Sequence, residues 1–239
     1  MHHDSSPAAG TLLLIASPIG NLDDISPRAR QALAAADLVA CEDTRVTGRL
    51  LHHLGLDKRM LSMHDHNERA RLPRLLDTLA QGLTIALVSD AGTPLVSDPG
   101  FPLVREAAAR GVRIEAIPGP SAFLLALIVS GLPPYPFTFA GFPPAKSGKR
   151  RRFYKNLRAL DHTLIVYESP HRIVASLDDA ATALDNRPAV IARELTKLHE
   201  EVLRGTLKTL RLELGARPSI KGELVLVIGG AQLPLDQAG

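Results

Sequence analysis

Short apolar runs alternate with helix-like segments across the first half of the chain. Runs of strand length lie at residues 11–16, 38–41, 59–63, 85–88 and 113–117, and the stretches between them carry apolar residues at helical intervals. A helix that joins two strands normally returns the chain to the same sheet in parallel orientation. The pattern therefore predicts an α/β fold whose N-terminal sheet is mostly parallel and has helices on both faces.

The second half of the chain predicts a different sheet. We expect strands at about 137–142, 162–167, 188–192, 200–204 and 223–228, and helices at about 121–130, 149–159, 170–184 and 206–214. Ser121, and Ser169 followed by Pro170, are typical of residues that begin a helix. Two successive strands near 190–204 have no helix between them, which favours a mixed sheet with an antiparallel part.

Turn-forming residues at 118–136 separate the two halves. We therefore expect a disordered start at 1–10, an N-terminal α/β domain at 11–120 and a C-terminal α/β domain at 121–235. The hydrophobic content of 45% is ample for a core.

Composition excludes several classes of protein. Cys41 is the only cysteine, so we expect neither an internal disulfide nor a thiolate metal cluster, and a buried strand position is more typical of it than a reactive thiol. The longest apolar run, 122–129, is too short to span a bilayer, and no leader opens the chain. We expect a soluble cytoplasmic protein without a membrane partner. The motifs GxSxG, HExxH and CxxC are absent, which leaves hydrolase and redox chemistry unsupported.

The loop after the strand at 85–88 is the strongest candidate for a ligand site. It runs from Ser89 to Gly100, longer than the roughly 2–6 residues of most such connections. Loops at the carboxyl ends of strands are where open α/β sheets bind ligands. Because the loop lacks both GxxxxGK[ST] and GxGxxG, we expect it to hold a ligand through backbone groups and Asp90.

Other polar clusters follow other strands, and each also has a plain structural explanation. Glu42 and Asp43 suit a helix N-terminus, and Arg45 either contacts an anion or pairs with Asp43. His64 and His66 could face the same way on an extended segment, but no third metal ligand is evident, so a hydrogen-bonded polar loop explains them better. We expect no metal. The joint placement of these clusters at strand ends favours a shared function.

The formal net charge is only +3, but basic residues gather in one segment. The members of this basic cluster are Lys146, Lys149, Arg150, Arg151, Arg152, Lys155 and Arg158. Such a cluster is typical of a surface that contacts phosphate groups.

Eight short motifs occur in order along the chain. They are Ser-Pro-Ile-Gly-Asn-Leu (17–22), Cys-Glu-Asp-Thr-Arg (41–45), His-Asp-His-Asn-Glu (64–68), Ser-Asp-Ala-Gly-Thr-Pro (89–94), Pro-Gly-Pro-Ser-Ala (118–122), Tyr-Glu-Ser-Pro-His-Arg (167–172), Ala-Arg-Glu-Leu-Thr-Lys (192–197) and Lys-Gly-Glu (221–223). Together they resemble the ribosomal RNA small subunit methyltransferase I family over about residues 11–230. The first motif begins Ser17-Pro18 where the family often has Thr-Pro, and many members continue for some tens of residues beyond the position of Gly239.

The resemblance implies S-adenosylmethionine-dependent methylation of a cytidine ribose 2′-hydroxyl in the decoding region of 16S rRNA. It also implies the tetrapyrrole methylase fold, in which two α/β domains hold the cofactor in the cleft between them, and usually a homodimer. The small ribosomal subunit is then the expected partner.

The resemblance also implies roles for single residues. The residues expected to contact the cofactor are Ser17, Pro18, Asp90, Ala91, Thr93, Ser121, Ala122, Tyr167, Leu195 and Glu223. The candidates for a base that takes the proton of the ribose hydroxyl are Glu42, Asp43, His64 and Lys197. The candidates for contact with RNA are Arg45, Lys146, Lys149, Arg150, Arg151, Arg152 and Arg172.

Two alternatives stay open at the level of sequence. One is a methyltransferase of the same fold that acts on a precorrin, whose carboxylates would also suit a basic loop. The other is an RNA-binding module without catalytic activity, since a fold does not fix a function. Binding of a ribosomal subunit would distinguish the rRNA methyltransferase from the precorrin enzyme, which would bind a tetrapyrrole. Binding of the cofactor would distinguish either enzyme from an RNA-binding module without activity.

Overall fold

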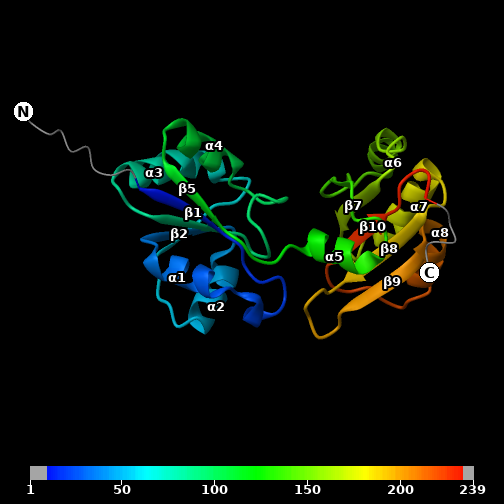
Figure 1. The fold of residues 1–239 in the computed structure, drawn as a ribbon, viewed down its shortest axis with the longest axis horizontal. Helices are drawn as coiled ribbons and strands as arrows, with labels where there is room; N and C mark the ends of the chain where they lie inside the picture. Colours follow the sequence, from blue (N-terminus) through cyan, green and yellow to red (C-terminus); the bar gives the residue numbers. More distant parts are fainter. Residues whose placement is uncertain (1–9, 234–239) are drawn as a thin grey trace, which may run out of the picture. The chain divides into compact units, whose positions relative to one another are not determined.

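The computed structural model describes residues 10–233, which form two compact units that divide between Pro120 and Ser121 (Figure 1). We call the part up to Pro120 unit 1 and the part from Ser121 unit 2. Residues 1–9 of the predicted disordered start lie outside the described residues. No helix within residues 10–233 is long and apolar enough to cross a membrane.

Gly10 was expected in the disordered start, but it belongs to the ordered fold. It is buried and donates its N–H to the Leu79 carbonyl at 2.9 Å. A Cβ atom on Gly10 would lie 2.1 Å from the Leu83 carbonyl oxygen. Only glycine fits at this close approach of two backbone segments.

Unit 1 is a parallel five-stranded sheet in the order β3-β2-β4-β1-β5, as the strand and helix alternation predicts. Its strands are β1 (Thr11–Ile15), β2 (Leu38–Cys41), β3 (Met60–Ser62), β4 (Ile85–Val88) and β5 (Arg113–Ile117). Its helices are the short 3-10 helix η1 (Leu22–Asp24), α1 (Pro27–Ala35), α2 (Thr44–His53), α3 (Glu68–Ala80) and α4 (Phe101–Ala109).

Helices cover both faces of the unit 1 sheet (Figure 1). Leu13 and Val39 pack with residues of α1 and α2, whereas Leu12 and Leu87 pack with residues of α3 and α4. The chain therefore leaves the neighbouring strands β1 and β4 toward opposite faces. Such a switch point, beyond the carboxyl ends of the strands, is where open α/β sheets bind ligands.

Unit 2 is a mixed five-stranded sheet in the order β6-β7-β10-β8-β9. Its strands are β6 (Phe137–Phe139), β7 (Thr163–Glu168), β8 (Pro188–Arg193), β9 (Glu201–Thr206) and β10 (Leu224–Ile228), and its helices are α5 (Ala122–Ser130), α6 (Ser147–Asn156), α7 (Ile173–Leu184) and α8 (Leu207–Gly215). β6 and β7 run parallel, and the other neighbours are antiparallel. The expected mixed sheet is confirmed.

The main core of unit 2 lies on one face of this sheet. There α6, α7 and α8 bury apolar side chains against alternate residues of the strands, such as Leu164 and Leu226. The helix α5 packs against β7, β8, β9 and β10. Arg204 of β9 donates hydrogen bonds to the Val129 and Ser130 carbonyls at the end of α5.

One predicted helix start is wrong. Helix α7 begins at Ile173, not at Pro170. Glu168 accepts a hydrogen bond from the Ser169 N–H at 2.9 Å and forms an ion pair with the Arg172 guanidinium at 2.9 Å. These contacts fold residues 169–172 into a turn, so the Ser-Pro pair stands one turn before the helix.

Candidate functional site

The loops after β1 and β4 are joined by their backbones. Ser17 and Gly92 exchange two N–H to carbonyl hydrogen bonds of 2.9 and 3.1 Å. The Ser17 hydroxyl donates to the Ser89 carbonyl, and the Ser89 hydroxyl donates to the Gly92 carbonyl. Gly92 has a φ of +86°, a conformation that glycine adopts without strain. Two of the predicted ligand loops are therefore one hydrogen-bonded structure at the switch point.

The loop after β2 joins the same structure through Asp90. One Asp90 carboxylate oxygen accepts the Asp43 N–H at 3.0 Å. Asp43 is the N-cap of α2 and accepts the Arg45 N–H at 2.8 Å. Nearby Ala91 is exposed, and the Thr93 hydroxyl donates to the Pro120 carbonyl. The structure thus brings the predicted residues of three strand ends together in unit 1.

Carboxylates gather at this edge of the sheet and raise one another's pKa. Burial, followed by the charges of Asp90 and Asp65, raises the pKa of Glu42. Burial, a stronger effect than the neighbouring Asp43 charge, also raises the pKa of Asp90. Asp98 lines a small pocket with Glu42 and Ser89, where burial and then the Glu42 and Asp90 charges raise its pKa to about 7. Asp98 therefore gains or loses its proton near neutral pH, where an ordinary aspartate is ionised.

Asp98 makes the stability of the fold depend on pH. Its pKa is higher in the folded state than in the unfolded chain, so folding binds a proton between about pH 4 and pH 7. We expect the free energy of unfolding to fall as pH rises through this range, and Asp98→Asn to remove that part of the fall. Urea unfolding at a series of pH values measures it. Asp57→Asn, at an exposed position, is the control, and equal pH profiles for the two variants would contradict the prediction.

The His64–Glu68 motif forms a compact turn before α3 and not the expected extended segment, yet the centroids of the His64 and His66 rings still lie 6.0 Å apart. Asn67 accepts the His64 N–H and donates from its amide to His64 Nε2. Glu68 accepts the Gly100 N–H at 3.1 Å. His64 Nδ1 is buried and has no hydrogen-bond partner among residues 10–233. The motif connects the turn after β3 with the start of α4.

Two of the four candidate bases are poorly suited to accept a proton. Hydrogen bonds from Arg45, which pairs with Asp43 at 2.6 Å, lower the pKa of Asp43 to about 2. In unit 2, burial lowers the pKa of Lys197, but hydrogen bonds to Glu194 and Glu223 outweigh it and raise the pKa overall. Asp43 is thus a very weak base, and Lys197 stays protonated.

The loop after β8 is the main polar structure of unit 2. Glu194 Oε1 accepts hydrogen bonds from Lys197 Nζ at 2.8 Å and from the Glu223 N–H at 3.0 Å. Glu194 and Thr196 have φ values of +53° and +66°, which is uncommon for residues other than glycine. The Thr196 hydroxyl is buried without a hydrogen-bond partner among residues 10–233, and Leu195 is buried. Strained backbone of this kind clusters at ligand sites.

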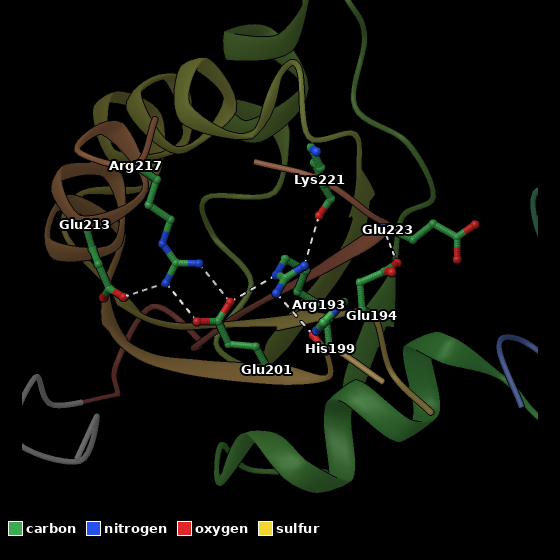
Figure 2. Close-up of polar contacts among 8 residues, drawn as sticks. All are labelled: Arg193, Glu194, His199, Glu201, Glu213, Arg217, Lys221 and Glu223. Atoms are coloured by element: carbon green, nitrogen blue, oxygen red, sulfur yellow. Dashed lines mark hydrogen bonds and ion pairs between the residues drawn. The ribbon is translucent and has the colours of Figure 1, made fainter. Parts of the chain in front are cut away.

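Arginine side chains fix the two ends of this loop (Figure 2). Arg193 donates to the His199 and Lys221 carbonyls at 3.1 Å each and pairs with Glu201. Glu201 also forms a bidentate ion pair with Arg217, with both N···O distances 2.8 Å. The loop between β8 and β9 is therefore tied to the segment that carries the Lys-Gly-Glu motif.

The remaining predicted residues of unit 2 lie at other element ends. Ser121 stands at the N-cap of α5, but its hydroxyl is buried and makes no capping or other hydrogen bond within residues 10–233. Ala122 follows as the first residue of α5. Tyr167 lies near the end of β7, and Arg172 pairs with the buried Glu168.

Most of the basic cluster lies on helix α6, with Lys146 just before the helix and Arg158 after it. Lys146, Lys149, Arg151 and Arg152 are exposed, as expected of a surface that contacts phosphates. Arg150 is buried, pairs with the buried Asp179 at 2.7 Å and donates to the Ala145 carbonyl. The prediction that Arg150 contacts RNA is therefore wrong, because its guanidinium lies inside unit 2.

Comparisons with known proteins agree with this fold. The family described as Tetrapyrrole (Corrin/Porphyrin) Methylases matches residues 11–211. Among solved structures, a diphthine synthase superposes with a TM-score of 0.70 at 17% identity, covering 95% of this chain and 92% of that one. A uroporphyrin-III-C-methyltransferase from Thermus thermophilus superposes with a TM-score of 0.62 at 20% identity, covering 93% and 95%. The fold is that of the tetrapyrrole methylases.

Relatives with higher sequence identity identify the family within the tetrapyrrole methylases to which the chain belongs. A ribosomal RNA small subunit methyltransferase I of Xylella fastidiosa is 50% identical over 93% of this chain and 82% of its own length. A protein of the same name from Mesorhizobium japonicum is 49% identical over 97% of this chain and 79% of its own length. Another from Escherichia coli O157:H7 is 45% identical over 96% of this chain and 81% of its own length. The chain belongs to the ribosomal RNA small subunit methyltransferase I family, within the tetrapyrrole methylases.

Three residues of these polar structures are absent from the sequence-based site. Ser89 and Asp98 line the small pocket in the loop after β4. The sequence already predicts this loop as a ligand loop, so its polar residues could all have been included among the site residues. Asp179 lies in the middle of α7. Nothing in the sequence around Asp179 indicates that its carboxylate pairs with an arginine on another helix.

Proposed function

We propose that this chain transfers the methyl group of S-adenosylmethionine to the ribose 2′-hydroxyl of a cytidine in the decoding region of 16S rRNA. The observation that carries the proposal is the hydrogen-bonded structure of Ser17, Asp43, Asp90 and Gly92, next to Glu42, a carboxyl group with a raised pKa. The relatives with 45–50% identity are named ribosomal RNA small subunit methyltransferase I, whereas the uroporphyrin-III-C-methyltransferase, at 20% identity, is similar in fold alone.

The residues present fit the cofactor. Ser121 and Thr196 each hold a buried hydroxyl without a hydrogen-bond partner in the described part of the chain, which leaves a donor and acceptor for a polar ligand. In unit 1 the proposed contacts are Ser17, Pro18, Asp90, Ala91 and Thr93, and in unit 2 they are Ser121, Ala122, Tyr167, Leu195 and Glu223. The bound cofactor supplies an electrophilic methyl group on a positively charged sulfur.

Among the four candidate bases, we assign the role to Glu42. Its pKa is raised toward the working pH, which strengthens it as a base compared with an ordinary carboxylate. Asp43 is held ionised by Arg45, and Lys197 is held protonated by two carboxylates. Nε2 of His64 already accepts a hydrogen bond from Asn67, and its Nδ1 is buried.

The exposed face of α6 supplies contacts to RNA phosphates. Lys146, Lys149 and Arg152 are exposed, whereas Arg151 is exposed but also pairs, at 3.1 Å, with the Asp179 carboxylate that binds Arg150. Arg45 and Arg172 are already paired with acidic side chains, so we give them a smaller part in binding. A phosphate surface of this kind contributes affinity that falls with salt and does not depend on sequence.

The test of the function is methyl transfer from labelled S-adenosylmethionine to purified small ribosomal subunits that lack the modification. We expect one labelled nucleotide, identified by mass spectrometry of nuclease fragments as 2′-O-methylcytidine. A label on a base atom, or on another RNA, would overturn the proposed chemistry. Binding of the cofactor without transfer to subunits, together with transfer to a tetrapyrrole, would favour the precorrin alternative.

Gly222 gives a separate test of the unit 2 part of the cofactor site. Its φ is +90°, and a Cβ atom there would lie 2.3 Å from the Glu194 side chain. We expect Gly222→Ala to displace the Glu194 carboxylate and to weaken cofactor binding about tenfold or more, measured by calorimetry. Gly131→Ala is the control, since Gly131 also has a positive φ but its Cβ would meet open space. Equal loss of affinity in both variants would contradict a specific role of Gly222.

A further inference from the structure

The few aromatic residues of this chain gather in unit 2. The sequence has six phenylalanines, three tyrosines and no tryptophan. Five of these nine rings form a continuous series of contacts with centroid distances of 4.5–6.2 Å, in the order Phe137, Phe123, Phe139, Tyr167 and Phe142. We call this series the aromatic row. It includes residues of β6, which is an edge strand of the sheet.

Phe142, at one end of the aromatic row, is exposed although its surroundings are fixed. The Tyr167 N–H donates to the Gly141 carbonyl at 3.0 Å. This hydrogen bond extends the pairing of β6 and β7 to the residue before Phe142. Pro143 and Pro144 follow, and each proline restricts the backbone. The ring of Phe142 lies 5.4 Å from that of Tyr167, yet Phe142 is 54% exposed. A large apolar ring that is held in place but uncovered is available to a partner.

Positive charge lies close to this ring along the chain. Lys146 comes four residues after Phe142, so their Cα atoms are at most about 14 Å apart even if the chain between them is fully extended. Lys149, Arg152 and Lys155 follow on α6 and are exposed. At the other end of the row, Tyr135 and Phe137 are 87% and 38% exposed. Residues 135–155 of unit 2 therefore bring exposed aromatic rings and exposed cations close together along the chain.

We propose that Phe142 is a stacking site for an unpaired base of the RNA substrate, while the cations of α6 contact the phosphates next to that base. This inference rests on the proposed function and names a subsite for its substrate. Proteins that bind single-stranded RNA combine these two features, because every base has a π-face and every nucleotide a phosphate. A second copy of the chain would not match this surface as well, since two such surfaces would bring the cations of α6 together.

The test compares Phe142→Ala and Phe142→Trp with the wild-type enzyme. A short oligocytidylate and the unmodified small subunit are the two RNA probes. We expect Phe142→Ala to bind both about tenfold more weakly, with an unchanged slope of affinity against salt, and Phe142→Trp to restore binding. The only indole of the Phe142→Trp variant should change its fluorescence when RNA binds. By contrast, Lys149→Ala should reduce the salt slope by about one.

Two controls separate this inference from other causes. Leu212→Ala removes an exposed apolar side chain of α8, 63% exposed, and should bind RNA as the wild type does. Cofactor affinity should be the same in all variants. If Phe142→Ala binds RNA normally, or changes only the sedimentation of the protein, the stacking site is refuted and the surface serves self-association. If the wild type binds RNA through Phe142 but methylates no subunit, the proposed function fails and the stacking site stands.

Discussion

Glu42→Gln is expected to lower the rate of methyl transfer by about a hundredfold or more, with cofactor affinity unchanged. General-base catalysis contributes roughly 10²–10⁴ to a rate, and glutamine keeps the shape of the side chain but cannot accept the proton. Since the pKa of Glu42 is raised by burial and by Asp90 and Asp65, the wild-type rate should increase with pH as this carboxyl group loses its proton. The variant should lose that part of the pH profile.

Single-turnover rates on unmodified small subunits, over a range of pH, measure this effect. Glu115→Gln is the matched control, because Glu115 lies on the edge strand β5 and pairs with Arg113 at 3.0 Å. A Glu42→Gln enzyme with the wild-type rate and pH profile would exclude Glu42 as the base. A slow variant that also fails to bind cofactor would indicate a structural role instead.

Asp179→Ala is expected to destabilise unit 2 by about 3–5 kcal/mol. Asp179 accepts hydrogen bonds from the Ser147 hydroxyl and the Arg150 guanidinium, and both partners of the Arg150 ion pair are nearly fully buried. Removal of one partner leaves a buried charge without its counterion, which is among the most costly single changes in a protein. The double variant Arg150→Met, Asp179→Leu should recover much of the lost stability, because it removes both charges.

Urea unfolding followed by tyrosine fluorescence measures this change in unit 2 alone. All three tyrosines, Tyr135, Tyr154 and Tyr167, lie in unit 2, and the sequence has no tryptophan. Asp178→Ala is the control on the same helix. Asp178 is exposed and pairs with Arg211 at 3.0 Å, so its loss should cost at most about 1 kcal/mol. Similar losses for the two variants would show that the buried pair contributes little.

The fold followed from the sequence because its signals are local. All strands of unit 1 except β5, which carries Arg113 and Glu115, are short and mostly apolar, and the proline or glycine that bounds a helix acts within one turn. The same local signals placed Ser17, Asp43 and Asp90 at strand ends, where the parallel order brings them together. Even so, Pro170 gave a wrong helix start, since the competing contact was a carboxylate on the preceding strand.

The errors in the site concern side chains whose partners are far away in the sequence. Arg150 looked like one more cation of the basic cluster, but it shares the buried face of α6 with Tyr154, four residues later, and its counterion is on α7. The helical period of the buried residues could have identified that face. No such rule relates Gly222 to the carboxylate of Glu194, because their contact depends on two loops meeting in space.

The pairing of Ser17 with Gly92 makes two distant segments of the chain one cooperative unit. Two backbone hydrogen bonds and the hydrogen bond from the Ser17 hydroxyl to the Ser89 carbonyl join the loops, so we expect a fluctuation that opens the loop after β1 to open the loop after β4 as well. The amide protons of Ser17 and Gly92 should accordingly report the same free energy of opening in native-state hydrogen exchange. A ligand that orders one loop would slow exchange in the other, even where it touches only the first.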